Sequence, residues 1–482
     1  MRTDIIRVRH TSIVLPEYDL GDCKKLEDYL SVWNQSYFRM DPTGFHYDEN
    51  KRELRIPRGV DVDYVAKLTR RPVEMQYKRD PSDKMTLKLK IEPRNDLQRK
   101  SIAFLIGETP FANTKDASQL TLNLDTGDGK TYCTIAALSL IGQRALIITH
   151  NDNIKNQWID SLTNMTSVDQ THIINVVGSK MMKKLTDTPD LKSKVAVINR
   201  RTLQSYAKKE GWTAVEKWFQ SMRFGVKVID EAHLEFENVI KTDLFSNVYK
   251  TIYLTANFER SGRHENRLFA ICFKNIAKYG ISTRAEKRRH IIYAPVRFTT
   301  HPSGDDRASM KKRMGFDRNT YSDYLIEQPE LYDALEWMID FFNRMDGKVL
   351  ILATKIDATV AIADKLKKRY PEKHIGIFNS KIDEDRKIMA LTEADIIVST
   401  PKSMGTGTDV KNLRAVIMLE PYTSKVTANQ TSGRLRDLGG NEHTFYAEFI
   451  DYGFPDIVRM FRNRLPIFKK KCKEIIQLEA GK

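Results

Sequence analysis

The stretch LTLNLDTGDGKTYCTIAALSL, residues 120–140, decides the fold class of this chain. An apolar, β-like run ends at Leu124, a loop with two glycines follows, and an apolar helical pattern begins after the loop. Glycines allow backbone N–H groups to converge on phosphate oxygens, while a lysine and a hydroxyl at the start of the helix can reach the outer phosphates and a magnesium ion. The sequence therefore predicts a nucleotide phosphate site, with Thr131 also a metal ligand. The residues expected to form it are Thr126, Gly127, Asp128, Gly129, Lys130 and Thr131.

This loop departs from the full G-x-x-x-x-G-K-[ST] pattern, because Leu124 stands where the first glycine would be. The alternative interpretation is a glycine-rich turn that only caps a helix and leaves Lys130 in solvent. A second motif favours the nucleotide interpretation.

That motif is FGVKVIDEAHLEF, residues 224–236, in which an acidic pair follows a second apolar run. Transfer of a phosphoryl group to water needs a carboxylate near the metal and another group that orients the attacking water. We therefore expect Asp230 to hold Mg²⁺ and Glu231 to activate water. His233 is expected to sense the γ-phosphate. An acidic strand end in a surface loop is the simpler alternative, but the buried-strand pattern before Asp230 argues against it.

Composition narrows the class of protein. The chain has 482 residues and a net charge of +16, which would attract a polyanion such as nucleic acid. No apolar run approaches the roughly 20 residues that span a bilayer, and the N-terminus lacks the pattern of a signal peptide. The 4 cysteines are scattered without a C-x-x-C pair, so neither a zinc site nor a disulfide framework is expected. We expect a cytoplasmic protein without a membrane partner.

Apolar runs alternate with helical patterns in two series. From Pro93, runs such as RALIITH and FGVKVID each end where polar residues begin, which is typical of buried parallel strands with crossover helices. A second series, which includes KVLILAT and ADIIVST, begins near His290. The sequence therefore predicts two α/β domains, at residues 93–289 and 290–482, and a basic helix at the end of the second. Residues 1–92 predict a small α+β domain.

The glycine loop and the Asp-Glu-Ala-His box resemble motifs I and II of superfamily-two helicases. Two further stretches extend the resemblance: PKSMGTGTDVKNL, residues 401–413, is similar to motif V, and TANQTSGRLRD, residues 427–437, to motif VI. The resemblance implies an α/β fold with two tandem RecA-like domains and ATP with Mg²⁺ between them. In motif V it implies that Thr400 touches the nucleic-acid backbone and that Gly407 and Asp409 lie near the nucleotide.

In motif VI the resemblance assigns roles to three side chains. Gln430 would help to position the attacking water, and Arg434 would reach the γ-phosphate. The family has its second arginine three residues after the first, where this chain has Asp437. Arg436, one residue early, is the candidate for that role.

Shorter matches imply further contacts. EPRNDLQRK resembles the adenine-reading glutamine motif through Gln98, and LTAN resembles motif III, in which Thr255 and Ala256 would join His233 in coupling hydrolysis to movement. Motifs Ia, Ib and IV imply nucleic-acid contacts by Thr149, His150, Asn199, Arg200 and Lys355.

The implied function is that of a DNA helicase. Within the superfamily the motifs are most similar to those of phage branch-migration helicases of the UvsW type, which carry a small N-terminal DNA-recognition domain. This predicts a motor that remodels forked or branched DNA in replication, recombination or repair, in the cytoplasm of a bacterial host. Three alternatives stay open: an RNA helicase, a nucleic-acid-stimulated ATPase that does not separate strands, and a degenerate nucleotide-binding scaffold.

Overall fold

The computed structural model describes residues 4–34, 39–76, 78–124, 127–255, 263–280, 290–312, 315–404, 410–422, 425–436, 438 and 442–480. The chain forms two compact units, Met1–Ile281 and Ser282–Lys482. Each is described by itself. Among the described residues, no helix is both long enough and apolar enough to cross a bilayer.

The first unit begins with a five-stranded sheet of order β5-β6-β2-β1-β7. It is mainly antiparallel, and β7 alone pairs in parallel, with β1. Its strands are β1 (Ile6–Val8), β2 (Ser12–Leu15), β5 (His46–Asp48), β6 (Glu53–Pro57) and β7 (Val73–Met75). Beside it are α1 (Lys24–Tyr29), α2 (Val62–Thr69) and the hairpin of β3 (Val32–Asn34) and β4 (Arg39–Asp41).

The main sheet of the first unit has seven parallel strands in the order β10-β11-β9-β12-β13-β8-β14. Its central strands are apolar on both faces, as expected for a sheet covered by helices on each side. The strands are β8 (Gln119–Asn123), β9 (Ala145–Thr149), β10 (Ile173–Val176), β11 (Val195–Asn199), β12 (Val226–Ile229), β13 (Lys250–Thr255) and β14 (Ala277–Tyr279). The helices are α3 (Asp96–Ile106), α4 (Lys130–Ile141), α5 (Asp152–Met165), α6 (Gly178–Asp187), α7 (Arg200–Glu210), α8 (Trp212–Met222), α9 (Phe236–Leu244) and α10 (Arg263–Cys272).

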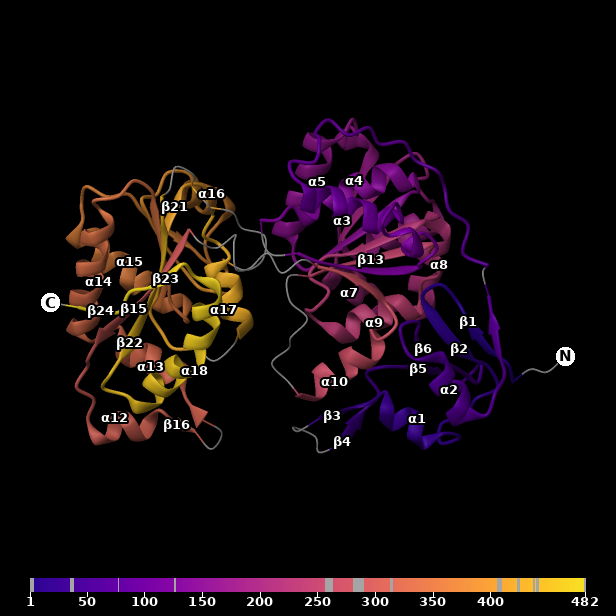
Figure 1. Cartoon of the computed structure of the whole chain (residues 1–482), viewed down its shortest axis with the longest axis horizontal. Coiled ribbons are helices and arrows are strands. Elements are labelled where there is room, and N and C mark those ends of the chain that lie inside the picture. Colours follow the sequence, from indigo (N-terminus) through magenta and orange to yellow (C-terminus); the bar gives the residue numbers. More distant parts are fainter. Residues whose placement is uncertain are drawn as a thin grey trace. The chain divides into compact units, whose positions relative to one another are not determined.

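The N-terminal sheet shares a hydrophobic core with one face of this main sheet. Buried residues of β1, β2 and β6 belong to the same apolar cluster as those of β9, β11, α8 and α9, and Figure 1 shows the N-terminal strands beside α8 and α9. Arg55 in β6 donates to Glu216 at 3.0 Å and to the carbonyl of Leu244 at 3.2 Å. At Gly59 a Cβ atom would lie 2.1 Å from the carbonyl oxygen of Cys272, so the two backbones approach as closely as glycine permits. The N-terminal sheet is therefore part of the first compact unit.

Asp80, in the connection between the two sheets of this unit, makes the stability of the fold depend on pH. Its Oδ2 atom is buried without a hydrogen-bond partner among the described residues, and burial together with the charge of Glu216 raises the pKa of Asp80 to about 6. The folded chain thus holds this proton more tightly than the unfolded chain, in which aspartate titrates near pH 4. Ionisation of Asp80 therefore lowers the free energy of unfolding. The full loss is present above about pH 6, and below about pH 4 there is no loss.

We expect Asp80→Asn to raise the free energy of unfolding at pH 7.5 by roughly 1–2 kcal/mol, a value discounted for the partial exposure of the side chain. The gain should vanish near pH 4 and can be measured by denaturant unfolding at both pH values. Asp160→Asn, at an exposed position of α5, is the control and should change neither curve. An equal gain at both pH values would contradict the explanation.

The second unit has an eight-stranded sheet of order β19-β20-β18-β21-β22-β15-β23, and β24 also pairs with β15. All of these pairs are parallel. The strands are β15 (Ile291–Phe298), β18 (Lys348–Leu352), β19 (Ile375–Phe378), β20 (Ile396–Ser399), β21 (Leu413–Met418), β22 (Thr444–Asp451), β23 (Glu474–Ile475) and β24 (Leu478–Glu479). The helices are α12 (Gly304–Ser309), α13 (Arg318–Leu325), α14 (Pro329–Phe342), α15 (Ile356–Arg369), α16 (Glu384–Thr392), α17 (Lys425–Ser432) and α18 (Pro455–Lys471). A hairpin of β16 (Lys311–Lys312) and β17 (Gly315–Phe316) follows α12.

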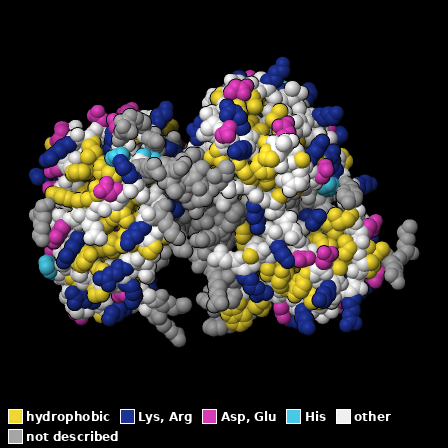
Figure 2. Space-filling view, viewed as in Figure 1, with side chains coloured by type: hydrophobic (Ala, Val, Ile, Leu, Met, Phe, Trp, Pro, Cys, Tyr) yellow, Lys and Arg dark blue, Asp and Glu magenta, His cyan; other side chains and the backbone are white. Residues whose placement is uncertain are grey.

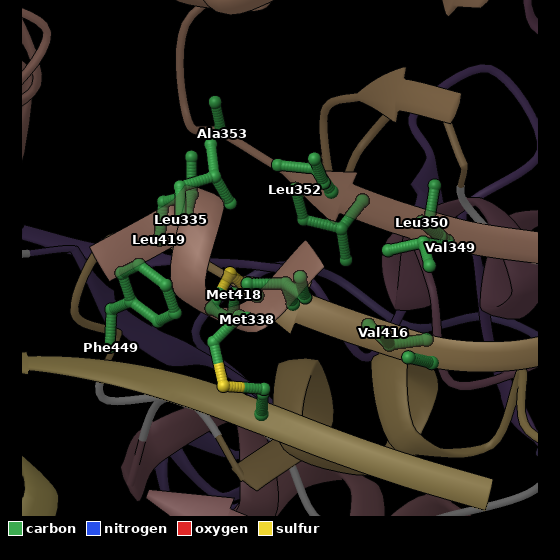
Figure 3. Packing of buried hydrophobic residues seen from close by; sticks show 14 of the residues in the cluster. Leu335, Met338, Val349, Leu350, Leu352, Ala353, Val416, Met418, Leu419 and Phe449 are labelled. Carbon is green, nitrogen blue, oxygen red and sulfur yellow. The ribbon is translucent and has the colours of Figure 1, made fainter. Parts of the chain in front are cut away.

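The core of the second unit lies between its sheet and the covering helices. Figure 3 shows Leu335 and Met338 of α14 against side chains of β18 and β21, among them Leu352 and Met418. The expected basic C-terminal helix is present as α18. It ends at Lys471, because the residues after it pair with β15 instead of continuing the helix.

The predicted α/β fold with two large parallel sheets and a small N-terminal sheet is confirmed. Figure 2 shows lysine and arginine side chains interspersed with acidic ones over the visible face. On that face the net positive charge is not gathered into a single patch.

Candidate nucleotide site and nucleic-acid face

The glycine loop connects β8 to α4, at the edge of the sheet where parallel strands end. Gly127 and Gly129 have φ angles of 92° and 89°, in the left-handed region that favours glycine. A Cβ atom at Gly129 would lie 2.3 Å from Nε2 of Gln98, so the loop also needs glycine there for space. Free N–H groups at the start of α4 make this loop suited to an anion. Thr126 lies outside the described residues.

Lys130 is the first residue of α4, and its side chain turns back over the loop. Its Nζ donates to the carbonyl oxygen of Leu124 at 2.9 Å. Leu124 therefore supplies a main-chain acceptor at the position where the family pattern has glycine, and its own side chain is buried in the core. Thr131 is half-buried at the next position of the helix.

Gln98, expected to read adenine, braces the loop from α3. Its side chain is 3% exposed, accepts the N–H of Arg94 at 3.0 Å and donates to the carbonyl of Asp128 at 3.3 Å. Both ends of the amide are thus engaged within the protein. Arg94 also donates to the carbonyl of Gly127. Whether Gln98 reads a base stays a prediction.

The acidic box begins where β12 ends, and both carboxylate oxygens of Asp230 are held. Oδ1 accepts the N–H of Glu231 at 2.9 Å, and Oδ2 accepts the indole N–H of Trp158, on α5, at 2.8 Å. Burial, with the neighbouring charge of Glu231, raises the pKa of Asp230, while Trp158 and Lys130 act in the opposite direction. A cation bound beside this carboxylate would offset the cost of its burial.

Glu231 and His233 link the ends of two neighbouring strands. Glu231 has a φ of 46°, an unusual conformation for a residue with a side chain. Its Oε2 atom lies 3.2 Å from Nδ1 of His233, and Oγ1 of Thr255, at the end of β13, lies 3.1 Å from the same nitrogen. The structure therefore brings together Glu231, His233 and Thr255. Ala256 lies outside the described residues.

The predicted magnesium site has few protein ligands. Within the part of the chain that the structure describes, no three histidine, cysteine or acidic side chains form a metal cluster. One carboxylate, Asp230, and the Thr131 hydroxyl fit the way Mg²⁺ binds beside nucleotides, where phosphates and waters complete the octahedron. These two residues would hold the ion.

The residues expected to touch nucleic acid from the first unit differ in exposure. Thr149 is buried, and its hydroxyl donates to main-chain carbonyls, while Asn199 caps α7 by accepting the N–H of Arg201 at 2.9 Å. Arg200 is 1% exposed and donates to the carbonyl of Asp230 at 2.8 Å. Its burial weighs against direct contact with a nucleic-acid backbone. His150 is half-buried, and burial lowers its pKa.

In the second unit, Thr400 and Lys355 follow the ends of β20 and β18. The Thr400 hydroxyl accepts the N–H of Ser403 at 3.0 Å and forms a turn at the end of its strand. Lys355 precedes α15, and its Nζ lies 2.6 Å from Oδ2 of Asp323. Gly407 and Asp409 lie outside the described residues.

Motif VI lies on and just after α17. Arg434 is 6% exposed, and Arg436 is half-buried and donates to the carbonyl of Gly433 at 3.2 Å. Gln430 is part of α17, but its side chain is outside the described part of the chain.

Sequence reasoning missed two contributors to the site. Trp158 lies on α5, and its indole N–H donates to the Asp230 carboxylate. Arg200 holds the main chain of the acidic box through its hydrogen bond to the carbonyl of Asp230. No local pattern could have revealed either contact, because 72 and 30 residues separate the partners.

Part of this chain matches a known family, and two viral proteins are similar to it. Residues 83–260 match the family ResIII, described as type III restriction enzyme, res subunit. The transcript termination protein A18 of Yaba-like disease virus is 25% identical over 336 residues, which cover 67% of this chain and 65% of that protein. The chain thus spans slightly less than two thirds of this relative. A18 of fowlpox virus is 24% identical, covering 70% of this chain and 71% of that protein.

Two solved structures, those of Mss116p and Dbp5, show the same fold. Mss116p bound to ssRNA and AMP-PNP matches with a TM-score of 0.55 and 16% identity, over 80% of this chain and 74% of that one. Dbp5 of S. cerevisiae bound to RNA and ADP BeF3 matches with a TM-score of 0.54 and 12% identity, over 81% and 91%. T4 UvsW aligns over 99% of this chain and 100% of its own, with 15% identity and a TM-score of 0.36. The predicted resemblance to superfamily-two helicases, with tandem RecA-like domains, is confirmed.

Proposed function

We propose that this chain is an ATP-driven motor that translocates on DNA and remodels forked or branched structures. The observation that carries the proposal is the arrangement at one edge of the first sheet. The phosphate loop follows β8, the acidic box follows β12, and Thr255 ends β13, which lies between those two strands in the sheet. A phosphate cradle, a carboxylate and a relay to the next strand are the parts that ATP hydrolysis needs.

Each described residue has a place in that reaction. The N–H groups of the loop and the Lys130 ammonium would hold the β- and γ-phosphates, and Glu231 would take the proton of the attacking water. When bound at Asp230 and Thr131, Mg²⁺ would neutralise phosphate charge. His233 lies between Glu231 and Thr255, so a change at the γ-phosphate could shift the end of β13.

Motif VI would supply an arginine to the reaction. The motif VI resemblance assigns Arg434 to the γ-phosphate, Arg436 to a second contact and Gln430 to the water. Gly407 and Asp409 are proposed to lie near the nucleotide. Hydrolysis changes the contacts that the nucleotide makes with the chain, so each turnover would shift the population between two arrangements.

Nucleic-acid contacts are proposed for side chains at the strand ends. The more exposed Lys355 and His150 are the stronger candidates. Thr149, Asn199 and Thr400 would contribute through the loops that they shape. Arg200 would act by supporting the acidic box.

A second candidate function is the release of transcripts from their template. It is favoured by the relatives, which are named transcript termination protein A18. The comparisons give no support for recombination or repair, so those roles depend on the motif likeness alone. An RNA substrate is the remaining alternative, since Mss116p and Dbp5 are described as bound to RNA.

One set of assays separates these functions. ATP turnover is measured without nucleic acid and with single-stranded DNA, duplex DNA, a fork, a four-way junction, RNA and an RNA–DNA hybrid. Strand displacement is followed on the duplex, the fork, the junction and the hybrid. Lys130→Ala serves as the control for a contaminating ATPase. Stimulation by forks or junctions with displacement supports the DNA motor. Displacement confined to the hybrid supports transcript release, and indifference to every nucleic acid would rule out both.

A further inference from the structure

We propose that a buried chain of hydroxyl groups, running from Tyr422 through Tyr446 to Thr431, positions α17 and thereby Arg434 for ATP hydrolysis. The inference rests on the proposed function, because it depends on Arg434 acting at the nucleotide. The three hydroxyl-bearing residues lie within the second unit and are buried. They are positioning residues, since none is assigned a contact with the nucleotide.

The direction of each hydrogen bond in this chain follows from its last acceptor. Oγ1 of Thr431 lies 2.8 Å from the carbonyl oxygen of Thr427, which can only accept, so the Thr431 proton is used there. Thr431 must therefore accept from the Tyr446 hydroxyl, 2.9 Å away. Tyr446 in turn accepts from the Tyr422 hydroxyl, also at 2.9 Å. Donors that point the same way along a chain polarise and strengthen one another.

The row of hydrogen-bonded hydroxyl groups ends beside the turn that carries Arg434. Thr431 lies in the last turn of α17, and the main-chain N–H of Arg434 donates to the carbonyl of Thr431 at 3.2 Å. The Tyr446 hydroxyl thus holds Thr431, whose carbonyl accepts the main-chain N–H of Arg434. A shift of one hydrogen bond in this core would move the start of the arginine side chain.

Tyr422, which precedes α17 in the chain, is held by the same core. Arg464 of α18 donates to the Tyr422 carbonyl and to the Glu448 carboxylate, and its guanidinium lies 4.3 Å from the centre of the Tyr422 ring. The Tyr293 hydroxyl donates to the other oxygen of Glu448 at 2.7 Å. Tyr422 is therefore held at its carbonyl, its ring and its hydroxyl.

Stability alone does not explain so many buried polar groups. A buried ion pair such as Arg464 with Glu448 can often be replaced by apolar residues at no cost in stability. The rings of Tyr446 and Phe468 stack with centroids 5.2 Å apart, so packing alone would hold a phenylalanine at position 446. The hydroxyl groups add hydrogen bonds that fix α17 in one position.

The test removes one hydroxyl and keeps the ring. Tyr446→Phe should lower kcat of nucleic-acid-stimulated ATP hydrolysis about tenfold, because it removes the hydrogen bond to Thr431 together with the one from Tyr422, and leave KM for ATP within about twofold. Tyr321→Phe is the matched control, because that buried hydroxyl of the same unit bonds Asp451 at 3.2 Å and has no described contact with α17. Its kcat should stay within about twofold of wild type, and both variants should melt at similar temperatures.

Changes at Thr431 complete the test. Thr431→Val should lower kcat as much as Tyr446→Phe, the double variant should be no worse than either, and Thr431→Ser should restore most of the rate. Equal kcat values for Tyr446→Phe and Tyr321→Phe would overturn the inference, as would a fall explained by a lower melting temperature or a higher KM. Arg434→Ala is assayed beside them. If it keeps full activity, the proposed role of Arg434 fails; if it alone is inactive, only the hydroxyl chain fails.

Discussion

Glu231→Gln is expected to lower nucleic-acid-stimulated ATP hydrolysis by about a thousandfold, the usual worth of a general base. The amide keeps the size of the carboxylate, but it replaces one acceptor oxygen with an NH2 donor and cannot take a proton from water. Binding of ATP should stay within a few-fold of wild type, because the phosphates are held by the loop and Lys130. Steady-state turnover and the binding of a fluorescent ATP analogue measure the two effects separately.

A neighbouring glutamate provides the matched control. Glu235 also has a positive φ, of 48°, and its carboxylate accepts from Gln204 at 3.2 Å. Glu235→Gln makes the same chemical change near the same strand end and should leave turnover within about threefold of wild type. If Glu231→Gln hydrolysed ATP normally, the assignment of the acidic box would be wrong. If both variants failed to bind nucleotide, the loss would be one of folding.

Arg434→Ala should lower kcat by about a thousandfold, because an arginine that meets the γ-phosphate in the transition state contributes on that scale. ATP would still bind to the loop in the first unit, so the analogue should bind with nearly the same affinity. A rapid-quench measurement of a single turnover locates the defect at the chemical step.

Arg436→Ala decides between two arginines. The family spacing places its second arginine at position 437, and Arg436 donates to the carbonyl of Gly433 within its own turn. We expect its removal to lower kcat about tenfold, well below the effect at Arg434. Equal losses would show that both reach the phosphate, and a larger loss at Arg436 would reverse the assignment.

Local patterns were enough to predict the main elements of the fold. Apolar runs that end in polar residues predicted β8, β9, β11 and β12, because strands buried on both faces need continuous apolar side chains. The phosphate loop was predicted for a similar reason, since its chemistry depends on residues that are adjacent in the chain.

Contacts between distant residues could not be predicted in the same way. A periodic pattern shows that Trp158 is on the buried face of α5, but it does not show that the indole reaches Asp230. Arg200 was expected to contact nucleic acid because of the motif Ib resemblance, and its burial depends on main-chain carbonyls that no sequence pattern displays. The short strands β23 and β24 were missed because only the open edge of β15 gives their sequence a partner.

Because the N-terminal sheet shares a core with the main sheet, it limits where this chain can be truncated or joined to another protein. An accessory module on a flexible tether can be deleted or exchanged between proteins, because few apolar contacts cross its boundary. Here buried side chains of β1, β2 and β6 share one hydrophobic core with those of α8 and α9. A truncated chain that begins near residue 83 would expose that surface to water and tend to self-associate. Chimaeras should therefore carry the first 281 residues as one unit.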